Sequence, residues 1–226
     1  MVIISSPGGM GCSYLLESLE RRIATNAFDD SDRLKHCPTP YDSRIPATCT
    51  RAVFVWNDPL KAILSLHRRG WLSVQCQKLE GYLFASRSCE VLWEMTSVFS
   101  RDVYGIENQA ANWIKAPRWP TLFFDMRRIR ESRDALANFL CCDASDLELL
   151  PRTTYDLTTV PADVQQVYQR LDEKVQSWGE ECNWRTLRTM EHGHCTILDP
   201  ALYGRNAERQ SGEQVSRPSP RHVSER

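Results

Sequence analysis

The opening of the chain constrains its fold more than any other segment, because it reads as a buried strand, a glycine-rich turn and a helix. Val2–Ser5 is an apolar run of strand type, the turn holds three glycines within 7–11, and 14–23 carries leucines at helical spacing. Such a turn exposes backbone N–H groups at the positive end of the helix, where a phosphate or sulfate group binds. The sequence therefore predicts an anion-binding loop near its start.

The same order of strand, turn and helix occurs twice more along the chain. Ala52–Trp56 is a second apolar run, after which Asp58 and Pro59 are expected to cap and open a helix that reaches Gly70. Thr121–Phe124 is a third strand, followed by apolar residues at helical spacing. Strands separated by helical stretches favour parallel crossovers, so we expect an α/β fold, a parallel sheet flanked by helices on both faces.

The remaining segments give weaker signals. We expect residues 72–118 to be mostly helical and residues 164–175 to form an amphipathic helix, whereas 25–50 is expected to be irregular with one short helix at most. The stretch after residue 204 is nearly devoid of apolar residues. The prediction is one domain over 1–204 and a disordered tail over 205–226.

Charge and hydropathy exclude several classes of protein. The formal net charge is -1, so no overall positive field attracts nucleic acid or a membrane surface. The longest apolar runs are far shorter than the roughly 18 residues that cross a bilayer, so we expect no membrane span. The start of the chain lacks the pattern of a signal peptide, and nine cysteines stand at scattered spacings. These features predict reduced thiols and a cytoplasmic location.

Spacing separates the ligands that a glycine loop can hold. The loop of kinases and ATPases needs a Lys-Ser/Thr pair after its last glycine, but Gly11 is followed by Cys12-Ser13. The dinucleotide fingerprint needs a third glycine where this chain has Tyr14. A tight turn without any ligand remains an alternative for the loop taken alone.

The ends of the first two predicted strands carry motifs that occur together elsewhere. Pro7 precedes Gly11-Cys12-Ser13-Tyr14, and the second strand runs into Asn57-Asp58-Pro59 with Ser65 six residues beyond Pro59. In this order the motifs resemble those of the sulfotransferase superfamily, whose members use 3′-phosphoadenosine 5′-phosphosulfate as sulfuryl donor. The resemblance implies a P-loop NTPase-like sulfotransferase fold.

Two further segments are similar to this family, so that the resemblance spans residues 2–142. Leu34-Lys35-His36-Cys37-Pro38 resembles the segment that carries the catalytic base, and Phe123-Phe124-Asp125-Met126 with Phe139-Leu140 resembles the third strand and its helix. Three features of the family pattern are absent. The loop has no lysine, Asn57 stands where the arginine for the donor's 3′-phosphate is expected, and the C-terminal glycine and lysine segment has only a faint counterpart.

The resemblance implies roles for individual residues. His36 would be the catalytic base, and Lys35 is the candidate to replace the missing loop lysine. Apart from the resemblance, Arg51, Arg68 and Arg69 are candidates to restore the missing positive charge, although solvated surface arginines are the favoured interpretation. The residues expected to bind the donor are Gly8, Gly9, Met10, Gly11, Cys12, Ser13, Tyr14, Asn57 and Ser65.

Two cysteine-containing features have competing interpretations. Cys12 stands at a helix N-terminus, which can lower a thiol pKa and make it reactive, but packing is the favoured interpretation. His192-Gly193-His194-Cys195 has metal-ligand residue types at a spacing that fits no closed zinc pattern, so a polar loop is favoured and no metal is expected.

The sequence thus predicts an enzyme that transfers a sulfuryl group to a hydroxyl or amine of a small molecule, a glycan or a protein, without metal or nucleic acid. A nucleotide- or partner-binding module of the same fold with decayed chemistry is the alternative, because the loop lysine and the arginine are missing. A P-loop kinase is a distant third. The identity of the acceptor and the oligomeric state have no signature in the sequence.

Overall fold

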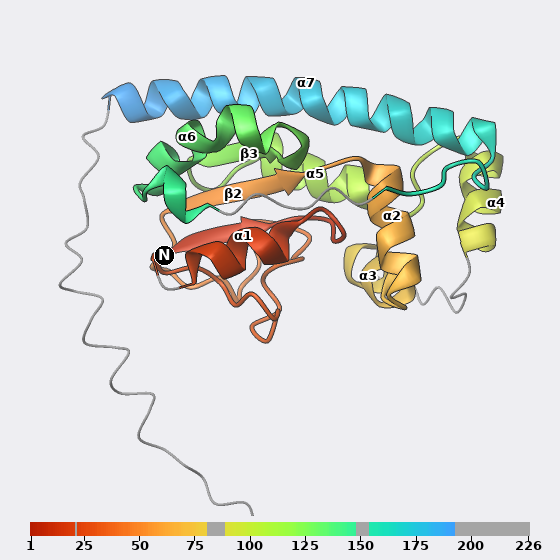
Figure 1. The fold of residues 1–226 in the computed structure, drawn as a ribbon, viewed down its shortest axis with the longest axis horizontal. Coiled ribbons are helices and arrows are strands. Elements are labelled where there is room, and N and C mark those ends of the chain that lie inside the picture. The colour runs from red at the N-terminus through yellow and green to blue at the C-terminus, as the bar shows by residue number, and fades with distance from the viewer. Residues whose placement is uncertain (21, 81–88, 148–153, 193–226) are drawn as a thin grey trace, which may run out of the picture. The chain divides into compact units, whose positions relative to one another are not determined.

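A parallel sheet organises the structure, which is a computed structural model that describes residues 1–20, 22–80, 89–147 and 154–192 (Figure 1). The elements follow one another along the chain as strands and helices in alternation. They are β1 (Val2–Ser5), α1 (Cys12–Leu19), β2 (Arg51–Trp56), α2 (Pro59–Arg68), α3 (Leu72–Glu80), α4 (Cys89–Phe99), α5 (Ile106–Ile114), β3 (Thr121–Asp125), α6 (Ile129–Leu140) and α7 (Ala162–His192), with short 3-10 turns at Met126–Arg128 and Ala144–Asp146.

The sheet has the order β1-β2-β3, and both strand pairs are parallel. Ile4 lies opposite Val53, and Phe54 lies opposite Phe123. Nearly all strand residues are buried, as expected for a parallel sheet covered by helices. The predicted α/β class with a parallel sheet is therefore confirmed.

The chain leaves β1 and β2 in opposite directions. Beyond the edge of β1 that faces away from β2, Val2 forms a parallel bridge with Thr25, and the Asn26 amide bonds both the N–H (2.7 Å) and the carbonyl (3.1 Å) of Ile4. After β2 the chain instead crosses to β3 on the other side. The loops that follow β1 and β2 consequently diverge, which opens a crevice at the carboxyl ends of these strands, the usual ligand site of such sheets.

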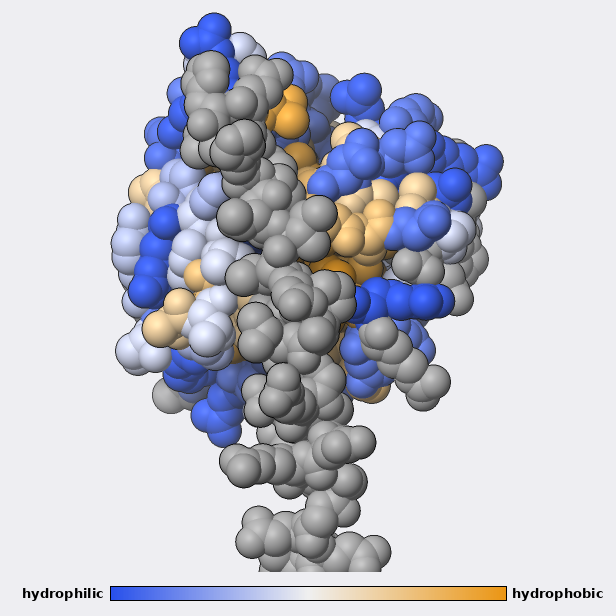
Figure 2. Space-filling view, turned by 90° about the vertical axis from the view of Figure 1, so that its left-hand side faces the viewer, coloured by the Kyte–Doolittle hydropathy of each residue, from blue (hydrophilic) through white to orange (hydrophobic). Residues whose placement is uncertain are grey.

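Helices cover the sheet from two sides. Helix α1 packs against β1 in front of the sheet, while α5 lies behind it against β2 and β3 (Figure 1). The Trp113 ring of α5 stacks on Phe54 with the ring centroids 6.3 Å apart. The side of the molecule seen in Figure 2 is mainly hydrophilic where its described residues are visible, with hydrophobic areas of small extent.

Helix α7 runs along the free edge of β3. The Asn183 amide accepts from the N–H of Phe123 (2.8 Å) and donates to its carbonyl (3.0 Å), and the Thr186 hydroxyl donates to the Thr121 carbonyl (2.7 Å). These bonds satisfy backbone groups that an open strand edge would leave to other chains. The helix extends far beyond the predicted range of 164–175.

Several other expectations can be compared with the structure. Asp58 caps α2 by accepting from the N–H of Lys61 (3.1 Å), as predicted. The helix after the glycine loop ends at Leu19 instead of 23, and residues 25–50 contain turns and no helix. The predicted domain boundary and the tail over 205–226 lie outside the described residues.

The part of 72–118 that the structure describes contains α3, α4 and α5, in agreement with a mostly helical segment. Among the cysteines that the structure describes, Cys12, Cys37, Cys49, Cys76, Cys89 and Cys182 are free thiols. Among the described helices none has the length and apolar character that a membrane crossing requires.

Candidate functional site

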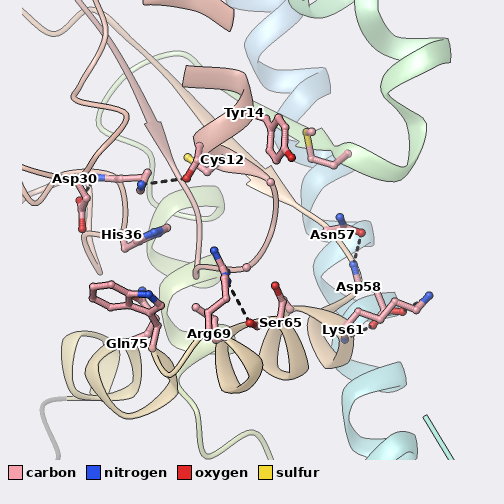
Figure 3. A pocket seen from close by; sticks show the side chains of 18 of the residues that line it. Cys12, Tyr14, Asp30, His36, Asn57, Asp58, Lys61, Ser65, Arg69 and Gln75 are labelled. Atoms are coloured by element: carbon pink, nitrogen blue, oxygen red, sulfur yellow. Dashed lines mark hydrogen bonds and ion pairs between the residues drawn. The ribbon is translucent and has the colours of Figure 1, made fainter. Parts of the chain in front are cut away.

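A cleft of about 1820 Å³ opens at the carboxyl ends of the strands, where the loops after β1 and β2 diverge. The glycine loop forms one wall, and α2 and α3 form the wall opposite to it (Figure 3). Residues of the irregular segment 29–44 and the beginning of α6 complete the lining. The residues that line the cleft include Gly9, Gly11, Cys12, Ser13, Tyr14, Asp29, Asp30, Arg33, Lys35, His36, Pro38, Arg44, Asn57, Asp58, Lys61, Ser65, Arg68, Arg69, Trp71, Val74, Gln75, Lys78, Arg127, Arg130 and Tyr155.

The glycine loop packs directly onto α2. Gly9 has a φ of 71°, and a Cβ atom there would lie 2.5 Å from the carbonyl oxygen of Ala62. Gly11 has a φ of 94° and precedes α1 without a side-chain cap, so no side chain at this position accepts from the N–H groups of the first helical turn. The loop therefore stays close to α2 and presents helix N–H groups at the cleft.

Replacement of Gly9 by alanine tests this contact against backbone strain alone. Gly70 has nearly the same φ, 72°, but a Cβ atom there would meet nothing within 4 Å. We expect Gly70→Ala to cost about 1 kcal/mol of unfolding free energy from the left-handed backbone, and Gly9→Ala to cost about 2 kcal/mol more because the loop must move off Ala62. Chemical denaturation of both variants measures the difference, and equal losses would contradict the packing of the loop on α2.

Lys35 lies at the start of α1 although it comes from the segment before β2. Its side chain is buried, and its Nζ donates to the Ser13 hydroxyl (3.1 Å) and to the carbonyl of Phe28 (2.6 Å). Within the described residues it has no carboxylate partner. A buried ammonium group with two neutral acceptors keeps one donor and a full charge for an anion beside the loop.

His36 is held next to Lys35 by a bond to the glycine loop. Its Nδ1 lies 2.9 Å from the Ser6 carbonyl, which can only accept, so Nδ1 carries the proton of the neutral ring and Nε2 is left as an acceptor. Burial lowers the pKa of His36 to about 4, against the opposing effects of the Ser6 carbonyl and Asp30. Its ring points into the cleft, neutral and basic at Nε2 (Figure 3).

The residues after β2 contribute polar groups from the opposite wall. Ser65 points toward the glycine loop from α2, and its hydroxyl has no partner among the described residues (Figure 3). The Asn57 side-chain oxygen accepts from the N–H of Asp58 (2.8 Å), which leaves its NH₂ group to donate. Arg69 donates through Nε to the Ser65 carbonyl (3.1 Å), and its guanidinium rises toward the loop.

Not every predicted donor-binding residue lines the cleft. Met10 is fully buried in the core, and Gly8 packs against the Gln75 side chain and is not part of the lining. Burial raises the pKa of the Cys12 thiol to about 12, which excludes the reactive thiolate and leaves the packing interpretation. Arg51 bonds the Phe139 carbonyl (2.6 Å) at α6 and is not part of the lining.

Most of the cleft's charge comes from residues that the sequence motifs do not include. Nine lining residues are lysine or arginine and three are aspartate. Four of the cations pair with carboxylates, among them Lys61 with Asp58 (3.1 Å) and Lys78 with Asp30 (2.6 Å). The lining cations without a carboxylate partner in the described part of the chain are Arg33, Lys35, Arg68, Arg69 and Arg130. In a chain with a net charge of -1, this excess marks a site for anions.

The described residues contain no group of three or more His, Cys, Asp or Glu side chains arranged to hold a metal ion. The segment 193–195 of the cysteine and histidine cluster lies outside them. No protein-family model, curated protein or solved structure matches the chain. The function is therefore argued from the cleft itself.

Proposed function

We propose that the chain is a sulfotransferase that takes a sulfuryl group from 3′-phosphoadenosine 5′-phosphosulfate and transfers it to a hydroxyl group. The observation that carries the proposal is Lys35, a buried ammonium that has no carboxylate partner in the described part of the chain and is fixed on Ser13 beside a neutral His36. An anion bound against the loop would supply the negative charge that pairs with the Lys35 ammonium. The site thus combines an anion clamp and a base within two consecutive residues.

The loop end of the cleft suits the phosphosulfate part of the donor. The N–H groups at the start of α1, the Ser13 hydroxyl and the Lys35 ammonium would hold the 5′-phosphate and neutralise the charge that develops on it. On the opposite wall Ser65, the Asn57 amide and Arg69 would hold a second phosphate. Two separated donor groups in one cleft favour a bisphosphorylated nucleotide over one with a single anionic end.

In the proposed reaction the acceptor oxygen forms a bond to sulfur while the bond between sulfur and the bridging phosphate oxygen breaks. His36 Nε2 accepts the proton of the attacking hydroxyl, and adenosine 3′,5′-bisphosphate leaves with the electron pair. The Lys35 ammonium, which is fixed on Ser13, would stabilise the negative charge on that leaving phosphate. The step as proposed requires positioning of the two reacting oxygens and fixed charge beside the leaving group.

Titration calorimetry with adenosine 3′,5′-bisphosphate tests the donor site directly. We expect a dissociation constant in the micromolar range and an affinity for 5′-AMP about tenfold weaker or more, because 5′-AMP lacks the second anion. ATP with and without Mg²⁺ is the control for a kinase. No binding of the bisphosphate at millimolar concentration would reject the proposal, and binding without any sulfuryl transfer would leave a nucleotide-binding module.

A further inference from the structure

Beyond His36 the cleft includes a second part, here called the acceptor half, which is lined by residues 71–78 and 29–44 and not by the groups proposed to bind the nucleotide. One wall of this acceptor half is a single face of α3 and the residue before it, with Trp71, Val74, Gln75 and Lys78 at helical spacing. The other wall is the segment 29–44. Lys78 joins the two walls through its ion pair with Asp30 (2.6 Å). An acceptor attacked with the help of His36 would lie between them.

Gln75 points to a ligand with an oxygen atom at the inner end of this half. Gln75 is 4% exposed and lines the cleft beside Gly8, yet its Nε2 has no hydrogen-bond partner among the residues that the structure describes. A buried amide donor without an acceptor is costly unless a bound molecule satisfies it. A hydroxyl or carboxylate oxygen of the acceptor would do so.

The outer part of the acceptor half offers a flat apolar surface. Trp71 is 58% exposed and Val74 is 45% exposed, and both line the cleft. An exposed indole beside a polar cavity provides a surface on which a planar ring stacks. The surface therefore fits an aromatic or sugar ring and offers little to a flexible aliphatic chain.

Arg33 supplies the charge of the acceptor half. Its backbone has a φ of 59°, a left-handed conformation that few arginines adopt, and the turn is closed by a bond from its N–H to the Asp30 carbonyl (2.9 Å). The other cations of this half are paired, Arg44 with Asp42 and Lys78 with Asp30. Asp30 is the lining carboxylate nearest to Arg33 in sequence, and its two oxygens already accept from Lys78 Nζ (2.6 Å) and from the N–H of Lys35 (3.0 Å).

The structure assigns this half to a specific class of acceptor, and we propose that the substrate is a ring-bearing hydroxyl compound with a carboxylate that Arg33 binds. This inference rests on the proposed sulfotransferase function. The ring would stack on Trp71, the Gln75 amide would donate to a ring oxygen, and the hydroxyl would face His36. The left-handed backbone of Arg33 is strained, and strained residues of this kind cluster at sites where a side chain contacts a ligand.

Initial rates of sulfuryl transfer to two matched pairs of acceptors test the inference. The aromatic pair is 4-hydroxybenzoate and its methyl ester, and the sugar pair is phenyl β-glucuronide and phenyl β-glucoside. We expect kcat/KM to be about tenfold or more higher for the charged member of whichever pair reacts, since a charge-assisted bond is lost in the neutral member. The pair that reacts identifies the ring.

Two variants separate the role of Arg33 from a general effect of charge. Arg33→Gly should abolish the preference for the charged acceptor while keeping or raising the melting temperature, because glycine adopts this φ without strain. Arg130→Ala removes another unpaired lining cation and should keep the preference. Equal rates for both members of a pair, or a preference that survives in Arg33→Gly, would overturn the inference about the acceptor and leave the proposed function standing. No transfer to any of the four acceptors would also overturn the inference, and the calorimetric titration with adenosine 3′,5′-bisphosphate then shows whether the donor site of the proposed function stands.

Discussion

Lys35→Met should lower the affinity for adenosine 3′,5′-bisphosphate by about 100-fold or more and abolish measurable sulfuryl transfer. The variant removes a buried charge whose donors end on the neutral oxygens of Ser13 and Phe28. Without nucleotide, the variant loses these two hydrogen bonds, but it also no longer carries the cost of burying an unpaired ammonium. The two effects offset each other, so the unfolding free energy should stay within about 1 kcal/mol of wild type. Calorimetry and thermal melting with and without the bisphosphate measure both effects.

A second cation of the same cleft provides the control for this prediction. Lys61 lines the cleft but is paired with Asp58 at 3.1 Å, and its side chain is 44% exposed to solvent. Lys61→Met should change the affinity by less than about threefold, because an exposed pair contributes little. Equal losses in the two variants would mean that the cleft attracts the nucleotide through its overall charge, and the special role of Lys35 would be refuted.

The sequence predicts the parts of the fold that depend on local pattern. The parallel sheet, the cap of α2 at Asp58 and the irregular 25–50 segment follow from apolar spacing and turn residues. The length of α7 does not, because beyond residue 175 its inward side is held by hydrogen bonds to β3 from Asn183 and Thr186 in place of a continuous apolar stripe. Those bonds exist only once the strand edge is in place.

The candidate site likewise contains residues that local sequence patterns predict and residues that only the folded structure reveals. The sequence motifs bring Ser13, Lys35, His36 and Ser65 into one cleft, although the spacing alone gives no reason for Lys35 to reach the helix start. The unpaired Arg33 and the orphaned Gln75 amide carry no motif, since their significance depends on burial and on partners that are absent. A search of the sequence for arginine next to a β-turn would have found Arg33 without distinguishing it from solvated neighbours.

His36→Ala should reduce kcat by about 100-fold to 10,000-fold while leaving the affinity for adenosine 3′,5′-bisphosphate nearly unchanged. The reason is geometric, since Nδ1 is bound to the Ser6 carbonyl and only Nε2 faces the cleft, where the acceptor hydroxyl would lie. His67→Ala is the matched control, because His67 is an exposed histidine near the end of α2 and should have wild-type rates. A normal kcat in His36→Ala would remove it from the mechanism and leave the donor site standing.

The pH dependence separates this buried base from an ordinary histidine. Because burial depresses the pKa of His36 to about 4 from 6.5, kcat/KM should stay level as the pH falls from 8 to about 5 and decline only below that.

The free energy of unfolding should also decrease as the pH falls through this range. Between 6.5 and about 4 the unfolded chain binds the proton that folded His36 refuses, so the contribution of a neutral His36 to folding is complete above 6.5 and is lost as the pH falls. His36→Ala should flatten this part of the stability profile, and an acid limb of kcat/KM centred near 6.5 would show that the ring titrates in water and that the Ser6 carbonyl does not hold it inside the cleft.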